Sequence, residues 1–254
     1  KNQKIISIAY LTFVGLIIYI TGERMAFATF ILGIFLLFFL MPNKKIIFFN
    51  SLCLVLFSLY IVNNLHPAYN DYTILESKPY HLGLKVEKNI NCKNNISNEC
   101  TIIKNLQPAF LTILQNFPNS AYGEVYDLAY KMWKDHPMTG IGLNNFTFVC
   151  NNDVRYNNIL KNYNCASHPH NIYLQWLVET GIFGLIIFVF YLAYLFYHIL
   201  KNNFNEYSLI SIVTIMGVFW PIMSTGSLLK NWNGIGIFFI IGICLVLSKI
   251  KEEN

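Results

Sequence analysis

Two histidines about two-thirds of the way along the chain are the strongest candidates for chemistry. His170 follows His168 by two residues and directly precedes an apolar stretch that is typical of a helix. The helix dipole opposes added positive charge at a helix N-terminus, so an imidazole there stays neutral. A neutral imidazole accepts a proton near pH 7, which makes His170 a candidate general base. His168, two residues earlier, is a candidate substrate contact. The structural alternative is that both histidines cap the helix or hydrogen-bond the loop.

Arg24 is the second candidate. It lies in the short polar turn 21–26 between two apolar runs. A guanidinium fork suits the oxygens of a phosphate or diphosphate better than a lysine does. The alternative is an interfacial anchor whose side chain reaches lipid headgroups.

Three further charged residues are candidate substrate contacts. Glu179 lies near the expected edge of the bilayer, where ionisable groups are functional candidates, although it could pair with Arg24 or a lysine. Arg155 and Lys161 could meet an anionic substrate, although a solvated surface position is the simpler interpretation of both. No cysteine or carboxylate stands at ligand spacing from the histidines, so the sequence predicts no metal site.

Six apolar runs surround these candidates. The chain is 55% hydrophobic and 12% charged, whereas soluble domains are about 25% charged. A spanning helix needs about 20 residues, and within hydrocarbon only a helix satisfies the backbone of such a run. The sequence therefore predicts an all-α polytopic membrane protein with about six transmembrane helices. The runs are 5–20, 25–41, 46–62, 182–200, 207–225 and 234–248.

Basic residues at the ends of these runs predict the orientation. They fall on one side of the membrane if the N-terminus is inside, as the positive-inside rule requires. The other side then receives Arg24, His170 and one large loop between spans three and four, which favours a shared site. We expect a multi-pass protein of a bacterial inner membrane with this loop in the periplasm. The expected parts are 1–63 (spans one to three), 64–170 (the loop) and 171–254 (an interfacial helix and spans four to six).

The large loop does not indicate nucleic-acid binding. The net charge is +5, but the loop holds nine Lys or Arg and eight Asp or Glu and has no basic stripe. Residues 104–117 and 120–136 look helical, so the loop is predicted to be mainly helical. At its end, residues 170–180 are expected to form a separate interfacial helix, with Gly181 and Gly184 supplying the bend or close packing between this helix and span four.

Four cysteines lie in this loop, and an oxidising compartment would pair them. Neighbours close short loops, which favours the disulfides Cys92–Cys100 and Cys150–Cys165. Zinc binding is the weaker alternative because the spacings fit no common finger.

Three segments together resemble the O-antigen ligase and O-antigen polymerase superfamily. The histidine segment and the glycines after it resemble the signature of that superfamily, with the His170–Gly181 spacing expected of the ligases. The segment upstream resembles the run that precedes this histidine, and the arginine turn resembles the turn that opens the conserved region. The segments are His170-Asn171-Ile172-Tyr173-Leu174 with Glu179-x-Gly181-x-x-Gly184-Leu185, Met132–Phe146, and Thr21-Gly22-Glu23-Arg24-Met25-Ala26.

The resemblance implies a metal-independent glycosyltransferase without a cofactor. Its donor would be a polyprenyl-diphosphate-linked glycan. Its acceptor would be the lipid A core, another glycan or a protein. His170 would be the general base for the acceptor hydroxyl, and Arg24 would bind the donor diphosphate. Relatives often have another arginine where Glu124 stands, so Arg155, Lys161 or a preceding part of the protein would supply the second contact. Family members usually have more spans, so we expect a C-terminal portion of a longer protein.

Within the superfamily, ligase, polymerase and protein O-oligosaccharyltransferase remain open, with the His–Gly spacing favouring a ligase. A membrane transporter or flippase is the alternative of another class. A carrier would be expected to have polar groups near the midplane, often in repeated halves. Here the span interiors are almost free of charge. A structural subunit whose loop binds partners is supported only by the loop's cysteines and aromatic residues.

Overall fold

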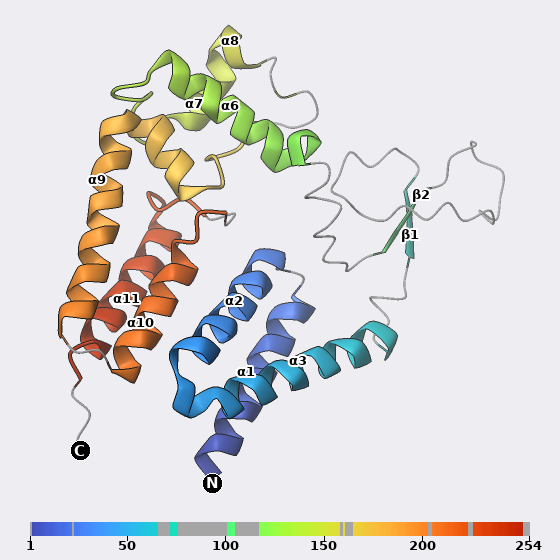
Figure 1. The fold of residues 1–254 in the computed structure, drawn as a ribbon. Coiled ribbons are helices and arrows are strands. Elements are labelled where there is room, and N and C mark those ends of the chain that lie inside the picture. The colour runs from blue at the N-terminus through green and yellow to red at the C-terminus, as the bar shows by residue number, and fades with distance from the viewer. Residues whose placement is uncertain are drawn as a thin grey trace, which may run out of the picture. The chain divides into compact units, whose positions relative to one another are not determined.

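The computed structural model is mainly helical (Figure 1). It describes residues 2–21, 23–65, 72–75, 101–104, 117–157, 160, 165–202, 205–222 and 226–250. The elements, in chain order, are α1 (Asn2–Ile20), α2 (Arg24–Leu40), the 3-10 turn η1 (Pro42–Lys44), α3 (Lys45–Leu65), β1 (Tyr72–Leu75), β2 (Thr101–Lys104), the 3-10 turn η2 (Phe117–Asn119), α6 (Ala121–Asp135), α7 (Phe146–Asn152), α8 (Val154–Asn157), α9 (Ile172–Asn202), α10 (Glu206–Val218) and α11 (Asn231–Leu247).

Each of the six predicted apolar runs contains a helix. Among the described residues, three helices are long and apolar enough to cross a membrane: Asn2–Ile20, Pro42–Val62 and Ile172–Lys201. The remaining three are apolar but shorter: Met25–Leu40, Glu206–Val218 and Trp232–Leu247. Ile187 and Phe190 of α9 are 67% and 71% exposed, as a surface that faces lipid requires. The chain is thus a mainly helical membrane protein, while six crossings stay a prediction.

The fifth run ends earlier than predicted. α10 stops at Val218, whereas the predicted span continued to residue 225. Pro221 has no backbone N–H and disfavours helical backbone at Trp220, so the helix cannot continue through this position. The chain instead leaves the helix at Phe219.

The large loop agrees with its prediction in one part and differs in another. α6 confirms the predicted helix over 120–136. The prediction of a helix over 104–117 is wrong at both ends, because Lys104 closes β2 and Phe117 opens η2; residues 105–116 lie outside the described part. β1 and β2 pair antiparallel with Tyr72 opposite Lys104, a ribbon that the all-α prediction lacked. The β-branched and aromatic residues of these short segments favour extended backbone.

The chain divides into two compact units, which are described separately. The N-terminal unit is Lys1–Ile31 with Ile46–Ala121, and the C-terminal unit is Leu32–Lys45 with Tyr122–Asn254. The three parts predicted from the membrane topology stay a prediction.

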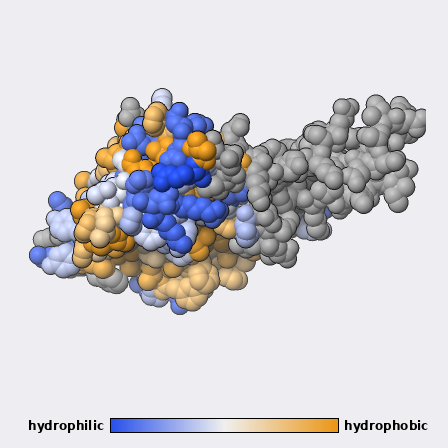
Figure 2. Space-filling view, turned by 90° about the horizontal axis from the view of Figure 1, so that it is seen from above, coloured by the Kyte–Doolittle hydropathy of each residue, from blue (hydrophilic) through white to orange (hydrophobic). Residues whose placement is uncertain are grey.

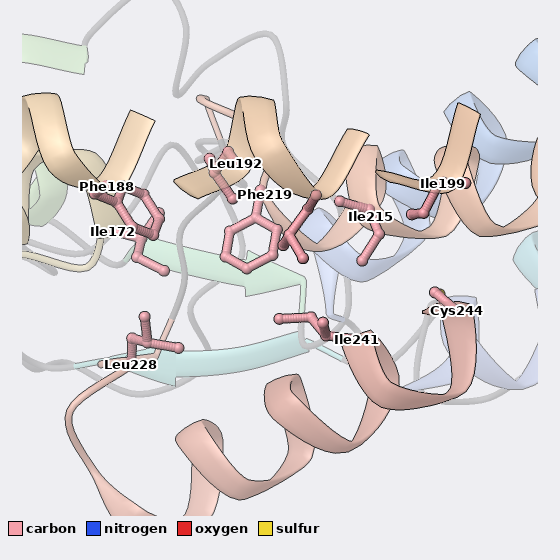
Figure 3. Close-up of a cluster of buried hydrophobic side chains, with 10 residues drawn as sticks. Ile172, Phe188, Leu192, Ile199, Ile215, Phe219, Leu228, Ile241 and Cys244 are labelled. Carbon is pink, nitrogen blue, oxygen red and sulfur yellow. The ribbon is translucent and has the colours of Figure 1, made fainter. Parts of the chain in front are cut away.

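Two clusters of buried side chains hold the C-terminal unit together. The first joins α9, α10, α11 and the turn before α11 (Figure 3), through Ile172, Phe188, Leu192, Leu195, Ile199, Ile215, Phe219, Leu228, Ile241 and Cys244. The second joins the loop helices to the start of α9, through Val125, Leu128, Ala129, Met132, Phe146, Cys150, Tyr156 and Val178. α9 therefore carries both clusters.

In a view toward α6, α7 and α8, hydrophilic residues gather on the outer surface of this part (Figure 2).

α9 is interrupted at Gly181, where the backbone leaves helical geometry (φ 70°, ψ −169°). A continuous helix would bond the Ile182 N–H to the Val178 carbonyl, one turn earlier. Here the Ile182 N–H donates to the Pro137 carbonyl at 2.9 Å, and the Val178 carbonyl accepts from the Ile141 N–H at 2.9 Å. The predicted bend at Gly181 is confirmed, and the 137–142 segment replaces the hydrogen bonds that the bend removes.

Only glycine fits at two contact points between this segment and the break. A Cβ atom on Gly181 would overlap the carbonyl oxygen of Met138, and φ is positive there. A Cβ on Gly140, which also has positive φ, would lie 2.5 Å from the Val178 carbonyl oxygen. The glycines in the segment before the histidine therefore serve backbone docking.

We predict that Gly181→Ala lowers the free energy of unfolding by about 2–4 kcal/mol. Left-handed backbone costs a residue with a Cβ about 1–2 kcal/mol, and each buried backbone group left unbonded costs about 1–3 kcal/mol. Unfolding of the purified protein in detergent measures the change.

Gly242→Ala is the matched control, because a Cβ there meets nothing within 4 Å. It should keep stability or raise it by up to about 1 kcal/mol, because alanine is the better helix former. Equal stability of the two variants would contradict the docking role of Gly181.

Candidate active site

A disulfide precedes the histidine segment. Cys150, in α7, is bonded to Cys165, with 5.9 Å between their Cα atoms. This is one of the two pairings predicted from neighbouring cysteines; Cys92 and Cys100 lie outside the described residues. The bond ties the chain just before His168 to the buried cluster of the loop helices.

Hydrogen bonds position the chain on both sides of His170. Before it, the Thr147 hydroxyl donates to the Ala166 carbonyl at 3.0 Å. After it, the Asn171 side chain accepts the Leu174 N–H at 3.0 Å, which is the contact of a helix N-cap. Asparagine directly before a predicted helix is a recognisable capping signal in the sequence.

The His170 backbone adopts a left-handed conformation, with φ 57°. This region costs a residue with a Cβ about 1–2 kcal/mol and persists only where the surroundings enforce it. The disulfide and the Asn171 cap supply that enforcement. Strained residues of this kind cluster at functional sites, which supports a role for the His170 side chain.

The His170 imidazole lies among rings. Its centroid is 4.3 Å from that of His168 and 5.5 Å from that of Tyr122, which meets it edge to face. Burial, then the charge of His168, then that of Lys230 lower the pKa of His170 from 6.5 to about 4. The imidazole is therefore neutral at pH 7 and free to accept a proton.

The start of α9 also holds the described parts of the chain between α10 and α11, residues 219–222 and 226–230, which we call the 219–230 segment. The N-cap residue and two side chains of α9 donate to it: Asn171 to the Pro221 carbonyl (2.7 Å), Tyr173 to the Phe219 carbonyl (2.7 Å) and Gln175 to the Ser227 hydroxyl (2.7 Å). Sequence reasoning missed these contacts because nothing in the sequence links residues so far apart. Lys230, the last residue of the segment, is near enough to His170 for its charge to lower the pKa of the imidazole.

Glu179 is 1% exposed and is held inside the C-terminal unit. Its carboxylate accepts the Asn144 N–H at 2.7 Å and the Gln175 side-chain amide at 3.2 Å. Asn144 has positive φ, so the carboxylate holds a strained turn in place. This geometry favours a positioning role for Glu179 over the substrate contact predicted from the sequence.

Arg24 is the first residue of α2 and belongs to the N-terminal unit, whereas His170 belongs to the C-terminal unit. The Arg24 side chain is outside the described part of the structure. Their shared site stays a prediction.

Arg155 already has partners. Its guanidinium pairs with Asp153 at 2.6 Å and with Asp135 at 3.3 Å. Two carboxylates balance its charge, so the surface interpretation fits Arg155 better than the binding of an anionic substrate. Lys161, the other loop candidate, is not among the described residues.

Proton transfer is the chemistry that this arrangement can perform. Within the described residues, no three His, Cys, Asp or Glu side chains form a group that could hold a metal ion. What the site offers is one neutral, half-buried imidazole on a constrained backbone.

Comparison with known proteins places the chain in a family. A model of the O-antigen ligase family matches residues 9–189, which is more than half of the chain. The match takes in the arginine turn, the large loop, His170 and the break at Gly181, and it ends before the 219–230 segment. No curated protein matches the chain. The chain therefore belongs to the O-antigen ligase family.

Proposed function

We propose that this protein transfers a glycan from a polyprenyl-diphosphate donor to an acceptor hydroxyl at the periplasmic face of a bacterial inner membrane. The family match supports a membrane glycan ligase or polymerase. The predicted topology supports the periplasmic face, because it puts the large loop and both candidate residues outside.

In this proposal, His170 is the general base. A ring nitrogen of its imidazole takes the proton of the acceptor hydroxyl as the hydroxyl oxygen forms a bond to the anomeric carbon. The bond between that carbon and the diphosphate oxygen breaks, and the diphosphate keeps the electron pair. The diphosphate is a good leaving group, so the protein chiefly positions the substrates and balances charge.

The observation that carries the proposal is the state of His170. Its side chain is half-buried, its pKa is lowered to about 4, and its backbone is held in a strained conformation. A purely structural histidine gains nothing from that strain, whereas a base gains a fixed direction toward its substrate.

Arg24 is proposed to bind the donor diphosphate. A guanidinium at that position would stabilise the negative charge that grows on the diphosphate as it leaves. This half of the proposal stands on the arginine turn in the sequence and on the family match, which covers the turn.

We predict that His170→Gly reduces glycan transfer about 10²–10⁴-fold without lowering stability. Removal of a general base costs a rate of this size. Glycine also relieves the left-handed strain, so the melting temperature should stay the same or rise. The assays are transfer from a polyprenyl-diphosphate glycan to candidate acceptors in vitro, and unfolding in detergent.

Asn144→Gly is the control, since it relieves a similar strain at φ 59° and keeps the imidazole. It should retain transfer. If His170→Gly lost stability and activity together, His170 would be a structural cap instead.

Arg24→Ala and Arg24→Lys are both predicted to reduce transfer by about 10²-fold, because one electrostatic contact to a leaving group is worth that much. Lysine keeps the charge but loses the two-pronged geometry. Arg155→Ala is the matched control: Arg155 is the only other arginine of the chain, and its partners are Asp153 and Asp135. Full transfer by Arg24→Ala would remove Arg24 from the proposal.

The pH dependence of kcat/KM should reflect the lowered pKa of His170. A base must be neutral to act, and a pKa of about 4 keeps it neutral as the pH falls past 6.5. The rate should therefore stay level through pH 6 and fall by half only near pH 4. In His168→Gln the midpoint should rise toward 6.5, because the charge of His168 is the second cause of the shift after burial. A midpoint at or above 6.5 in the unmodified protein would speak against His170 as the base.

A further inference from the structure

The 219–230 segment is fixed against the helix that begins at the histidine. Its contacts with Asn171, Tyr173 and Gln175 lie within the first turns of α9. The Ser227 hydroxyl that Gln175 holds also accepts the Leu229 N–H at 3.2 Å. Hydrogen bonds thus hold the end of the segment in place, as they hold the chain around His170.

Lys230 is the last residue of this segment. Its N–H donates to the Ser227 carbonyl at 3.3 Å, and its carbonyl accepts the Gly234 N–H at 2.9 Å in the first turn of α11. The side chain is exposed and makes no ion pair within the described part of the chain. A fixed backbone therefore presents an unbalanced ammonium group.

That ammonium group acts on His170. Its charge is the third cause of the lowered pKa of His170, after burial and His168. A base that takes up a proton becomes positively charged, and a neighbouring cation opposes this unless an anion lies close to both. A substrate phosphate close to both groups would supply that anion.

We propose that Lys230 binds a phosphate oxygen of a lipid-linked substrate beside His170, either in the donor diphosphate or in a phosphorylated acceptor. The proposal rests on the transfer reaction proposed above. An ammonium group binds phosphate as a compact point charge from any direction, so it complements the two-pronged contact expected of Arg24. Lys230 lies outside residues 9–189, so the family match does not assign it this role.

The test compares Lys230→Met and Lys230→Arg with the unmodified full chain in neutral detergent, which contains no phosphate. Lys230→Met should raise KM for one substrate about tenfold, as expected for the loss of one charge-assisted hydrogen bond. Lys230→Arg should recover most of the loss. Added salt should raise the KM of the unmodified protein more than that of Lys230→Met, because salt screens an exposed charge.

Lys249→Met is the matched control. Lys249 lies just beyond the other end of α11, about 28 Å along the helix from Lys230 at 1.5 Å per residue. It is also exposed, and its loss should leave both KM values unchanged.

Titration of each substrate separates the two sources of phosphate. A rise in KM for the donor assigns Lys230 to the diphosphate, and a rise confined to a phosphorylated acceptor assigns it to the acceptor. No rise for either, or a defect seen only in phospholipid vesicles, overturns the proposal, the latter by assigning Lys230 to lipid headgroups.

A binding measurement keeps this proposal separate from the transfer reaction. In an inactive His170→Ala background, the affinity for polyprenyl diphosphate without a glycan should fall about tenfold when Lys230→Met is added, if the contact is to the diphosphate. If the contact is to the acceptor, the same fall should appear with the phosphorylated acceptor. Absence of transfer by the unmodified protein would refute the proposed function, whereas unchanged affinity for both ligands would refute only the role of Lys230.

Discussion

The interruption of α9 at Gly181 is the constraint on which the C-terminal unit depends. A helix in an apolar setting cannot leave backbone groups unbonded, so a break needs a partner that restores its hydrogen bonds. The 137–142 segment is that partner: Ile141 and Gly142 donate to the Val178 and Glu179 carbonyls, and Pro137 accepts from Ile182. The break therefore joins the loop helices to the helix that follows His170.

Rigid support is what makes the strained backbone of His170 tenable. The disulfide at Cys165 holds the chain before it, and the Asn171 cap holds the chain after it. The same first turns of α9 are bonded to the 219–230 segment, so three parts of the sequence meet at one helix end. Such convergence limits movement of the imidazole, which the role proposed for His170 requires.

The charged side chains of the C-terminal unit differ in whether another group of the protein pairs with them. The buried carboxylate of Glu179 receives two hydrogen bonds, and Arg155 is paired with two aspartates. Lys230 has no ion-pair partner among the described residues, and His170 is kept neutral. This difference in pairing is why Lys230, and not Arg155, is proposed to meet a substrate phosphate.

Local pattern determined much of the fold. The apolar runs, the helix over 120–136 and the bend at Gly181 follow from side-chain periodicity and from glycine, which act within a few residues. The family could also be identified from short motifs, which single out His170 as a candidate. The tertiary structure decided what depends on distant partners: the burial of Glu179, the pairing of Arg155, the docking of the 137–142 and 219–230 segments, and the place of Lys230. Hydrogen bonds between residues 35 to 52 positions apart leave no periodic trace in a sequence, so only the folded chain reveals them.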